Sequence, residues 1–239
     1  MAMNLPGELV WVLDILGYEW PPIDEDELRR AAQIVRQFGE DIEGTIELAS
    51  SRINDDLSAA MKTGSATAYK SAWNTTREGN MRQLVDLIDP AATGMDLFAD
   101  AVVAMKVKVI AELVITAAQI AAAAASAIFT LGASVAANAA IIALRKKALD
   151  ILTDIAVEAI AGQVLSMLVE PLTSVAVDLA TAITDAPVVE GAIGDVSEFE
   201  ADLDALDQTA GDLEANGQDQ EKLADSFLSQ ISSCQIITG

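Results

Sequence analysis

The chain has 239 residues and a formal net charge of −23, from 37 acidic against 14 basic residues, and it contains no histidine. The negative charge repels a phosphate backbone, so no nucleic acid is expected as a partner, and the missing histidine removes the commonest general base and metal ligand. Apolar residues make up 52% of the chain and aromatic residues only 4%. This dominance of Ala, Leu, Ile and Val predicts an all-α fold.

A short apolar segment opens the chain and ends at a proline pair. Within residues 5–22, an apolar run is followed by Gly17, Tyr18, Trp20, Pro21 and Pro22. Two consecutive prolines cannot continue a helix, so we expect a short helix and then a stop. Acids lie among the apolar residues and no basic stretch precedes them, which excludes a Sec-type signal peptide.

A long amphipathic helix is predicted next. Asp24 and Glu27 have the spacing of an N-cap residue and a carboxylate at the third helical position. Apolar residues then recur every seven positions, at Leu28, Val35 and Ile42. One helix is therefore expected from about residue 25 to 61.

Gly64 is the expected turn residue after this helix, because glycine readily takes the left-handed conformation that ends a helix. A second apolar stripe follows in steps typical of a helix, with Tyr69, Trp73, Met81, Leu84 and Ile88. We expect this second helix to end near Asp89–Pro90 and to pair with the first as an antiparallel hairpin. Trp73 has two interpretations, a core aromatic or a recognition residue near the turn.

Residues 113–144 form an alanine-rich apolar segment, with 32 consecutive uncharged residues of which 14 are alanine. About 20 apolar residues are enough to cross a bilayer. The segment is either a pair of helices, broken near Gly132 and buried in a helical bundle, or a membrane span. A third interpretation is a segment hidden at first and released into a membrane later. Arg145–Lys147, which closes it, is either a solvated helix end or a contact for anionic lipid.

The C-terminal region is strongly acidic, since residues 185–225 contain 13 acids and one base. The stretch before it, about 148–184, is expected to be a mostly buried helix interrupted at Pro171. In the tail, apolar residues step by three and four at Val196, Phe199, Leu203, Leu206, Ala210 and Leu213. A break at Asn216–Gly217 would make the tail a small acidic helical hairpin, which docks either on the parent domain or on a separate partner.

The usual signatures of catalysis are missing. Cys234 is the single cysteine, so an internal disulfide and a Cys-rich metal site are excluded. There is no glycine-rich phosphate loop, and the acids have the spacing of solvated helix faces. We expect no catalytic residue, no cofactor and no metal site, and hence no enzyme.

The predicted fold is an elongated helical hairpin packed on an alanine-rich apolar helical bundle, with the acidic helical hairpin at the C-terminus. Residues 1–90 hold the N-terminal segment and the hairpin. Residues 91–186 supply the apolar helices of the same domain, and 187–239 form the acidic tail.

The order of short motifs resembles the WXG-like N-terminal domain of actinobacterial polymorphic toxins and type VII secretion effectors, also described as an outer-membrane-channel-protein-like N-terminal domain. The resemblance covers about residues 4–170, and its N-terminal motif contains Pro6, Gly7, Gly17, Tyr18, Trp20 and Pro21, followed by a long helix, Gly64 and Trp73. The chain departs from the wider family in two respects. It has no Trp-x-Gly tripeptide, and neither tyrosine is followed four residues later by an acid.

The resemblance implies a secreted or cell-envelope protein that is made in the cytoplasm and exported by a type VII route. It implies a delivery or adaptor module whose partner is a small WXG-type helical-hairpin protein or the secretion machinery. Gly64, Tyr69 and Trp73 would then mark the hairpin turn and a recognition site, and the missing export motif implies that a partner supplies the signal. The alternative function is a membrane-active, α-helical pore-forming or channel module.

Overall fold

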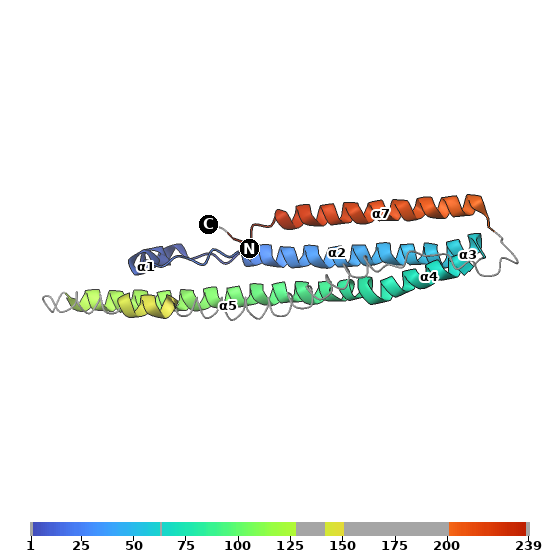
Figure 1. Cartoon of the computed structure of the whole chain (residues 1–239). Helices are drawn as coiled ribbons and strands as arrows, with labels where there is room; N and C mark the ends of the chain where they lie inside the picture. The colour runs from blue at the N-terminus through green and yellow to red at the C-terminus, as the bar shows by residue number, and fades with distance from the viewer. Residues whose placement is uncertain (1, 63, 128–141, 151–200, 238–239) are drawn as a thin grey trace. The chain divides into compact units, whose positions relative to one another are not determined.

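The computed structural model describes residues 2–62, 64–127, 142–150 and 201–237. Within these ranges the secondary structure is helical, and no strand is formed apart from isolated single-pair bridges (Figure 1). The predicted all-α fold is therefore confirmed.

The N-terminal segment forms the predicted short helix, which stops at Gly17, before the proline pair from which the stop is predicted. A 3-10 turn, η1 (Gly7–Leu9), leads into α1 (Val10–Leu16). Gly17 follows in the left-handed conformation with φ 58°, which glycine adopts without a steric penalty. Its N–H donates to the Asp14 carbonyl at 3.1 Å, and this bond closes the last turn of α1.

The predicted long helix begins at its predicted cap. The Asp24 carboxylate accepts the backbone N–H groups of Asp26 at 2.9 Å and Glu27 at 3.1 Å. These two bonds satisfy donors that have no partner within the helix. Helix α2 accordingly spans Glu25–Ser51.

The hairpin turn lies just before Gly64. Beyond α2, a π-helical turn, η2 (Arg52–Asp56), leads into α3 (Leu57–Ala60). The backbone then becomes extended at Met61, with φ −142° and ψ 118°, and α4 (Gly64–Thr76) begins three residues later. Met61 therefore ends the first helix of the hairpin, and Gly64 is the first residue of the second.

Helix α5 (Arg82–Ala127) follows α4 after another π-helical turn, η3 (Arg77–Met81). The helix end predicted near Asp89–Pro90 is wrong, because α5 continues through Pro90. Proline removes a hydrogen bond from a helix interior, but Arg36 binds the helix on both sides of it. The Arg36 guanidinium donates to the Asp89 carboxylate at 3.3 Å and to the Thr93 hydroxyl at 3.4 Å.

The acidic tail is one helix, α7 (Leu203–Ser232), so the break predicted at Asn216–Gly217 is wrong. Glycine lowers helix stability by about 1 kcal/mol relative to alanine, but contacts along one face of α7 offset this loss. Asn216 is only 5% exposed and donates to the Thr45 carbonyl at 3.0 Å. The buried stripe also differs from the predicted one, because Thr209 is buried and Ala210 is exposed.

Contacts divide the chain into two compact units. Among the described residues, the first unit contains 2–30, 94–127, 142–150 and 234–237. The second unit contains 31–62, 64–93 and 201–233. Helices α2 and α5 each contribute one part to each unit.

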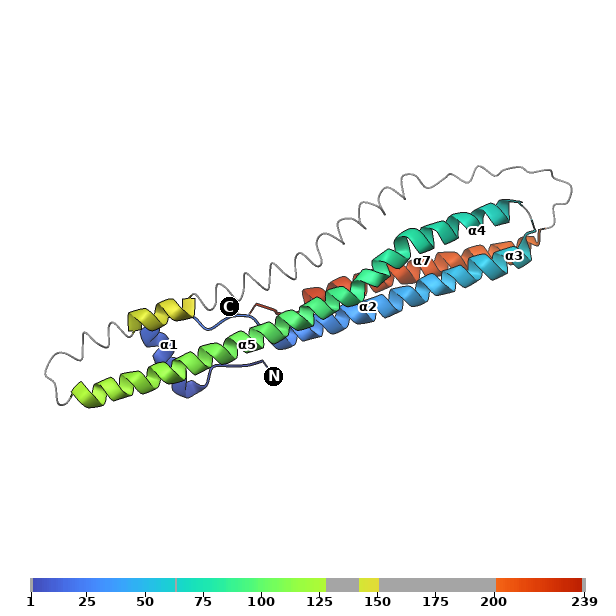
Figure 2. The same ribbon diagram turned by 90° about the horizontal axis from the view of Figure 1, so that it is seen from below.

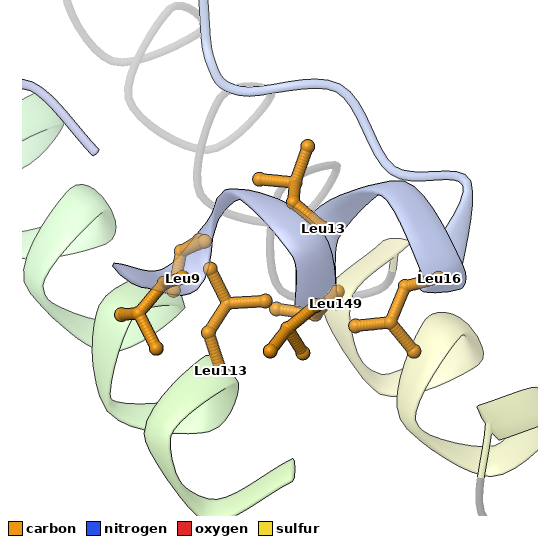
Figure 3. Packing of buried hydrophobic residues seen from close by; sticks show 7 residues of the cluster. Leu9, Leu13, Leu16, Leu113 and Leu149 are labelled. Carbon is orange, nitrogen blue, oxygen red and sulfur yellow. The ribbon is translucent and has the colours of Figure 1, made fainter. Parts of the chain in front are cut away.

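The first unit has an apolar core on the inner face of α1. Its buried residues come from the α1 segment, from α5 and from the helical residues 142–150, and they are Leu9, Val12, Leu13, Leu16, Val109, Leu113 and Leu149. Figure 3 shows Leu113 and Leu149 next to α1. A second cluster joins Leu28 of α2 to Ala99, Val102 and Met105 of α5.

The second unit is a bundle of the hairpin and α7. Figure 2, like Figure 1, shows α7 alongside α2 and α3. On the side of α2 that faces α5, Gly39 allows a close approach, because a Cβ atom there would lie 2.7 Å from Cγ2 of Ile88. On the side that faces α7, Phe38 stacks on Phe227 with ring centroids 4.5 Å apart.

Several predictions fall on residues outside the described ranges. These are the break near Gly132, the stretch after residue 150 with Pro171, and the first part of the acidic stripe. The domain boundaries after residues 90 and 186 stay predictions. Among the helices that the structure describes, none combines the length and the apolar composition needed to cross a membrane.

Candidate functional site

The predicted recognition residues lie together in the second unit, around the hairpin turn. Tyr69, on α4, is 43% exposed. Trp73 lies one turn further along and is half-buried, and its indole N–H donates to the Ser50 hydroxyl at 3.0 Å. Trp73 therefore links α4 to α2, whereas Tyr69 is the residue of the pair that a partner can contact.

A lysine between these two aromatic residues also ties the helices of the hairpin together. The Lys70 ammonium donates to the Asn54 carbonyl at 3.0 Å and to the Ser58 hydroxyl at 2.8 Å. Asn54 lies within the π-helical turn η2. These polar contacts hold the α4 backbone, and Tyr69 with it, in a defined position against α3.

An apolar cavity of about 430 Å³ lies beside Tyr69, and we call it the end groove. It is lined by Leu57, Met61, Tyr69, Leu206, Thr209, Ala210 and Leu213. Helices α3 and α4 supply one wall and α7 supplies the other. Its volume falls in the range of ligand pockets, which are mostly apolar with a few polar groups.

Acids surround the end groove along the sequence. Asp56 precedes Leu57, and Asp207 follows Leu206. A second hollow of about 330 Å³ shares Thr209 with the groove and is lined by Asp56, Asp202 and Asp212 among others. The lining of the end groove itself carries no charge, so an apolar side chain would match it.

Arg52 is the basic side chain of this second hollow. Its guanidinium lies 2.7 Å from the Asp56 carboxylate and 3.4 Å from that of Asp212. The hydrogen bond that Arg52 donates to Asp56, followed by the charge of Asp212, raises the pKa of Arg52 above its ordinary value. The cation therefore connects η2 of the hairpin with α7.

The N-terminal motif lies in the first unit. Its residues are Pro6, Gly7, Gly17, Tyr18, Trp20 and Pro21. Pro6 caps the 3-10 turn by accepting the Leu9 N–H at 2.9 Å. Tyr18 and Trp20 pack against the apolar core of this unit, and Pro21 is buried. Their contacts connect the segment after α1 to α5.

A buried ion pair lies at the centre of this motif. Glu25 is 2% exposed and Lys106 is 3% exposed, and their carboxylate and ammonium groups are 2.6 Å apart. The same ammonium donates to the Ile23 carbonyl at 2.7 Å and lies 5.8 Å from the centre of the Trp20 ring. The Glu25 carboxylate also accepts the backbone N–H of Met3.

The surroundings of Glu25 shift its pKa. Burial by itself would raise the pKa, but the hydrogen bonds from Lys106 and from the Met3 N–H outweigh it and hold the pKa below the ordinary value of 4.5. Glu25 is therefore ionised at neutral pH. Two opposite charges with further hydrogen bonds are the arrangement in which burial of an ion pair is tolerated.

Sequence reasoning missed this pair, although a signal was present. Ala99, Val102, Lys106, Val109 and Leu113 are separated by alternating steps of three and four, and all five are buried. A lysine at a core position of such a stripe requires a buried acid. Glu25 could not be identified as that acid, because three acids lie in the first turn of α2.

Among the described residues, no group of three or more His, Cys, Asp or Glu side chains is placed to hold a metal ion. The sequence of residues 5–146 matches the family described as "WXG100 like domain". No curated protein and no solved structure matches the chain.

Proposed function

The chain belongs to the WXG100-like domain family, and on that basis we propose that it is a non-enzymatic delivery or adaptor module that binds a helical partner through the end groove. The family is helical and associated with type VII secretion, and so is this chain. The matched residues include both helices of the hairpin and the N-terminal motif.

The end groove is the observation that carries the proposal. It is an apolar cavity beside the hairpin turn, and the exposed Tyr69 forms part of its wall. Tyrosine contributes strongly to protein interfaces because it combines a large apolar ring with a polar hydroxyl. The residues that line the groove carry no charge, so it favours a partner helix that presents an apolar side chain.

The test is co-purification of the full chain from its own cells with a small helical-hairpin protein encoded beside it. The Tyr69→Ala variant should bind that partner at least about tenfold more weakly in calorimetry, as expected for an interface aromatic. Leu48→Ala is the matched control, because Leu48 is also exposed in the second unit but lies away from the groove. It should leave the affinity unchanged.

Export provides the second readout. The chain should be lost from the culture medium when the type VII secretion ATPase is deleted. A chain that purifies without any helical partner, and whose level in the medium does not depend on that ATPase, would refute the proposal. Equal binding by the Tyr69→Ala and Leu48→Ala variants would refute the role of the end groove alone.

A further inference from the structure

Helix α7 lies outside the residues that match the family, which end at 146. It nevertheless covers one side of the hairpin's first helix in the second unit. We call this side the docking face and define it by Phe38, Thr45, Arg52 and Ala60, each of which contacts the region 202–227. The chain thus adds a third helix to the hairpin, and this helix is not part of the matched family domain.

Four contacts define how α7 lies on the docking face. Phe227 stacks on Phe38 at 4.5 Å, and Asn216 donates to the Thr45 carbonyl at 3.0 Å. Further along the docking face, Asp212 lies 3.4 Å from Arg52, and the Asp202 N–H donates to the Ala60 carbonyl at 2.8 Å. Residue numbers rise on one helix as they fall on the other, so α7 is antiparallel to α2 and α3.

The inner side of α7 has the three-four spacing of a coiled coil, but it is partly polar. The positions that step along it are Leu206, Thr209, Leu213, Asn216, Gln220, Leu223 and Phe227. Three of these seven are polar, and Gln220 donates to Asn216 at 3.1 Å. A polar residue at a core position fixes the register of a helix pair and reduces its stability. The pairing is therefore specific in register but not optimised for strength.

Two further features weaken the attachment of α7. The end groove and the second hollow share Thr209, so the first turns of α7 are incompletely packed. The helix also carries seven acids and one base, Lys222. Like charges along a helix repel one another and destabilise the compact state. The end of α7 beside the groove is thus held mainly by polar contacts, which include the bond from Asp202 to Ala60 and the ion pair of Asp212 with Arg52.

We propose that α7 is a displaceable occupant of the docking face, whose place is taken by an amphipathic helix of the partner. The incoming helix has the same pattern as α7, with an aromatic residue opposite Phe38, an amide opposite Thr45 and an acid opposite Arg52. This rests on the proposed function and deepens it: the partner first contacts the end groove, one wall of which is α7, and its helix then replaces α7 on the docking face. While α7 is bound, it lowers the affinity of any helix added from outside.

A labelled copy of α7 itself tests this. A fluorescent synthetic peptide of residues 203–232 is titrated into the full-length protein, and binding is followed by fluorescence anisotropy. Phe227→Ala weakens the attached α7 and leaves Phe38 intact, so the peptide should bind this variant at least about tenfold more tightly than the wild type. Leu228→Ala is the matched control, because Leu228 is adjacent but 59% exposed, and it should behave as wild type.

Two more variants keep the test decisive. Asn216→Ala removes one hydrogen bond from the attached helix, so the peptide should bind about two- to tenfold more tightly even if Phe227→Ala fails to fold. Adding Phe38→Ala to the Phe227→Ala variant should abolish its gain, because Phe227 of the peptide then has no ring to stack on. Peptide affinities that are the same for wild type and Asn216→Ala, or a gain of Phe227→Ala that survives Phe38→Ala, would overturn the proposal. No natural partner or secretion enters the assay, so its failure is distinguishable from failure of the proposed function.

Discussion

The two units of the chain are held together by different kinds of contact. The first unit has a continuous apolar core from three segments, and its one buried ion pair has further hydrogen bonds on both partners. The buried apolar residues of the second unit are mostly alanines, and they are joined by a glycine crossing, an aromatic stack and amide hydrogen bonds. Its hairpin also leaves cavities beside α7.

This difference predicts that helices separate at a smaller free-energy cost in the second unit than in the first. Truncating an apolar side chain in such a core, or removing one partner of its hydrogen-bonded ion pair, strongly lowers the stability of the unit. Helices joined through polar core positions and flanked by hollows can separate at smaller free-energy cost. The second unit is therefore the one in which we propose that a partner helix binds, and the N-terminal motif packs in the first.

Removal of the buried lysine should have the largest effect. Lys106→Ala leaves the Glu25 carboxylate buried without its cation, which costs about 3–5 kcal/mol for such pairs. Hydrogen exchange of the first-unit part of α5 should accelerate accordingly. Lys108→Ala, two residues away and exposed, should leave the exchange unchanged. If both variants exchange alike, the pair does not hold this unit.

A methyl group at the hairpin crossing should have an intermediate effect in the second unit. Gly39→Ala places a Cβ atom against Ile88 and should destabilise this unit by about 1–3 kcal/mol, as overpacking does. Gly44→Ala provides the contrast, because nothing lies within 4 Å of a Cβ at that position, and it should stabilise the helix by about 0.5–1 kcal/mol. Both stability changes can be measured by urea denaturation, followed by the fluorescence of Trp73 in a protein whose other tryptophans are replaced. Equal shifts of the midpoint would show that the two helices do not approach closely at Gly39.

Lowering the pH should have the smallest effect of the three changes, and this effect should be confined to the first unit, which contains Glu25. Because the pKa of folded Glu25 lies below the ordinary value of 4.5, its stabilising contribution is complete above the unfolded pKa and is lost as the pH falls through the folded pKa. The stability difference between wild type and Glu25→Gln should therefore shrink on going from pH 6 towards the folded pKa, to about zero once both forms are neutral. Hydrogen exchange of first-unit amides at several pH values measures it. A difference that does not change with pH would mean that Glu25 is not ionised in the folded state.

Much of the secondary structure follows from local sequence patterns. The N-cap at Asp24 and the stop at Gly17 are local because a side chain or a glycine acts on its own helix end. The two helices of the hairpin follow from three-four apolar stripes. Gly64 begins the second helix of the hairpin directly after the turn, and Met61, where the backbone becomes extended, forms a bridge with Ala201.

Helix continuity and side-chain pairing depended on distant residues. Pro90 and Gly217 lie inside helices whose neighbouring residues contact Arg36 and Thr45, far away in sequence. Which side of α7 is buried was likewise decided by the docking face. The Glu25–Lys106 pair joins residues 81 positions apart. Propensity, capping and periodicity act within a few residues and so determined the helices, whereas burial and charge pairing act between segments and became visible only in the tertiary structure.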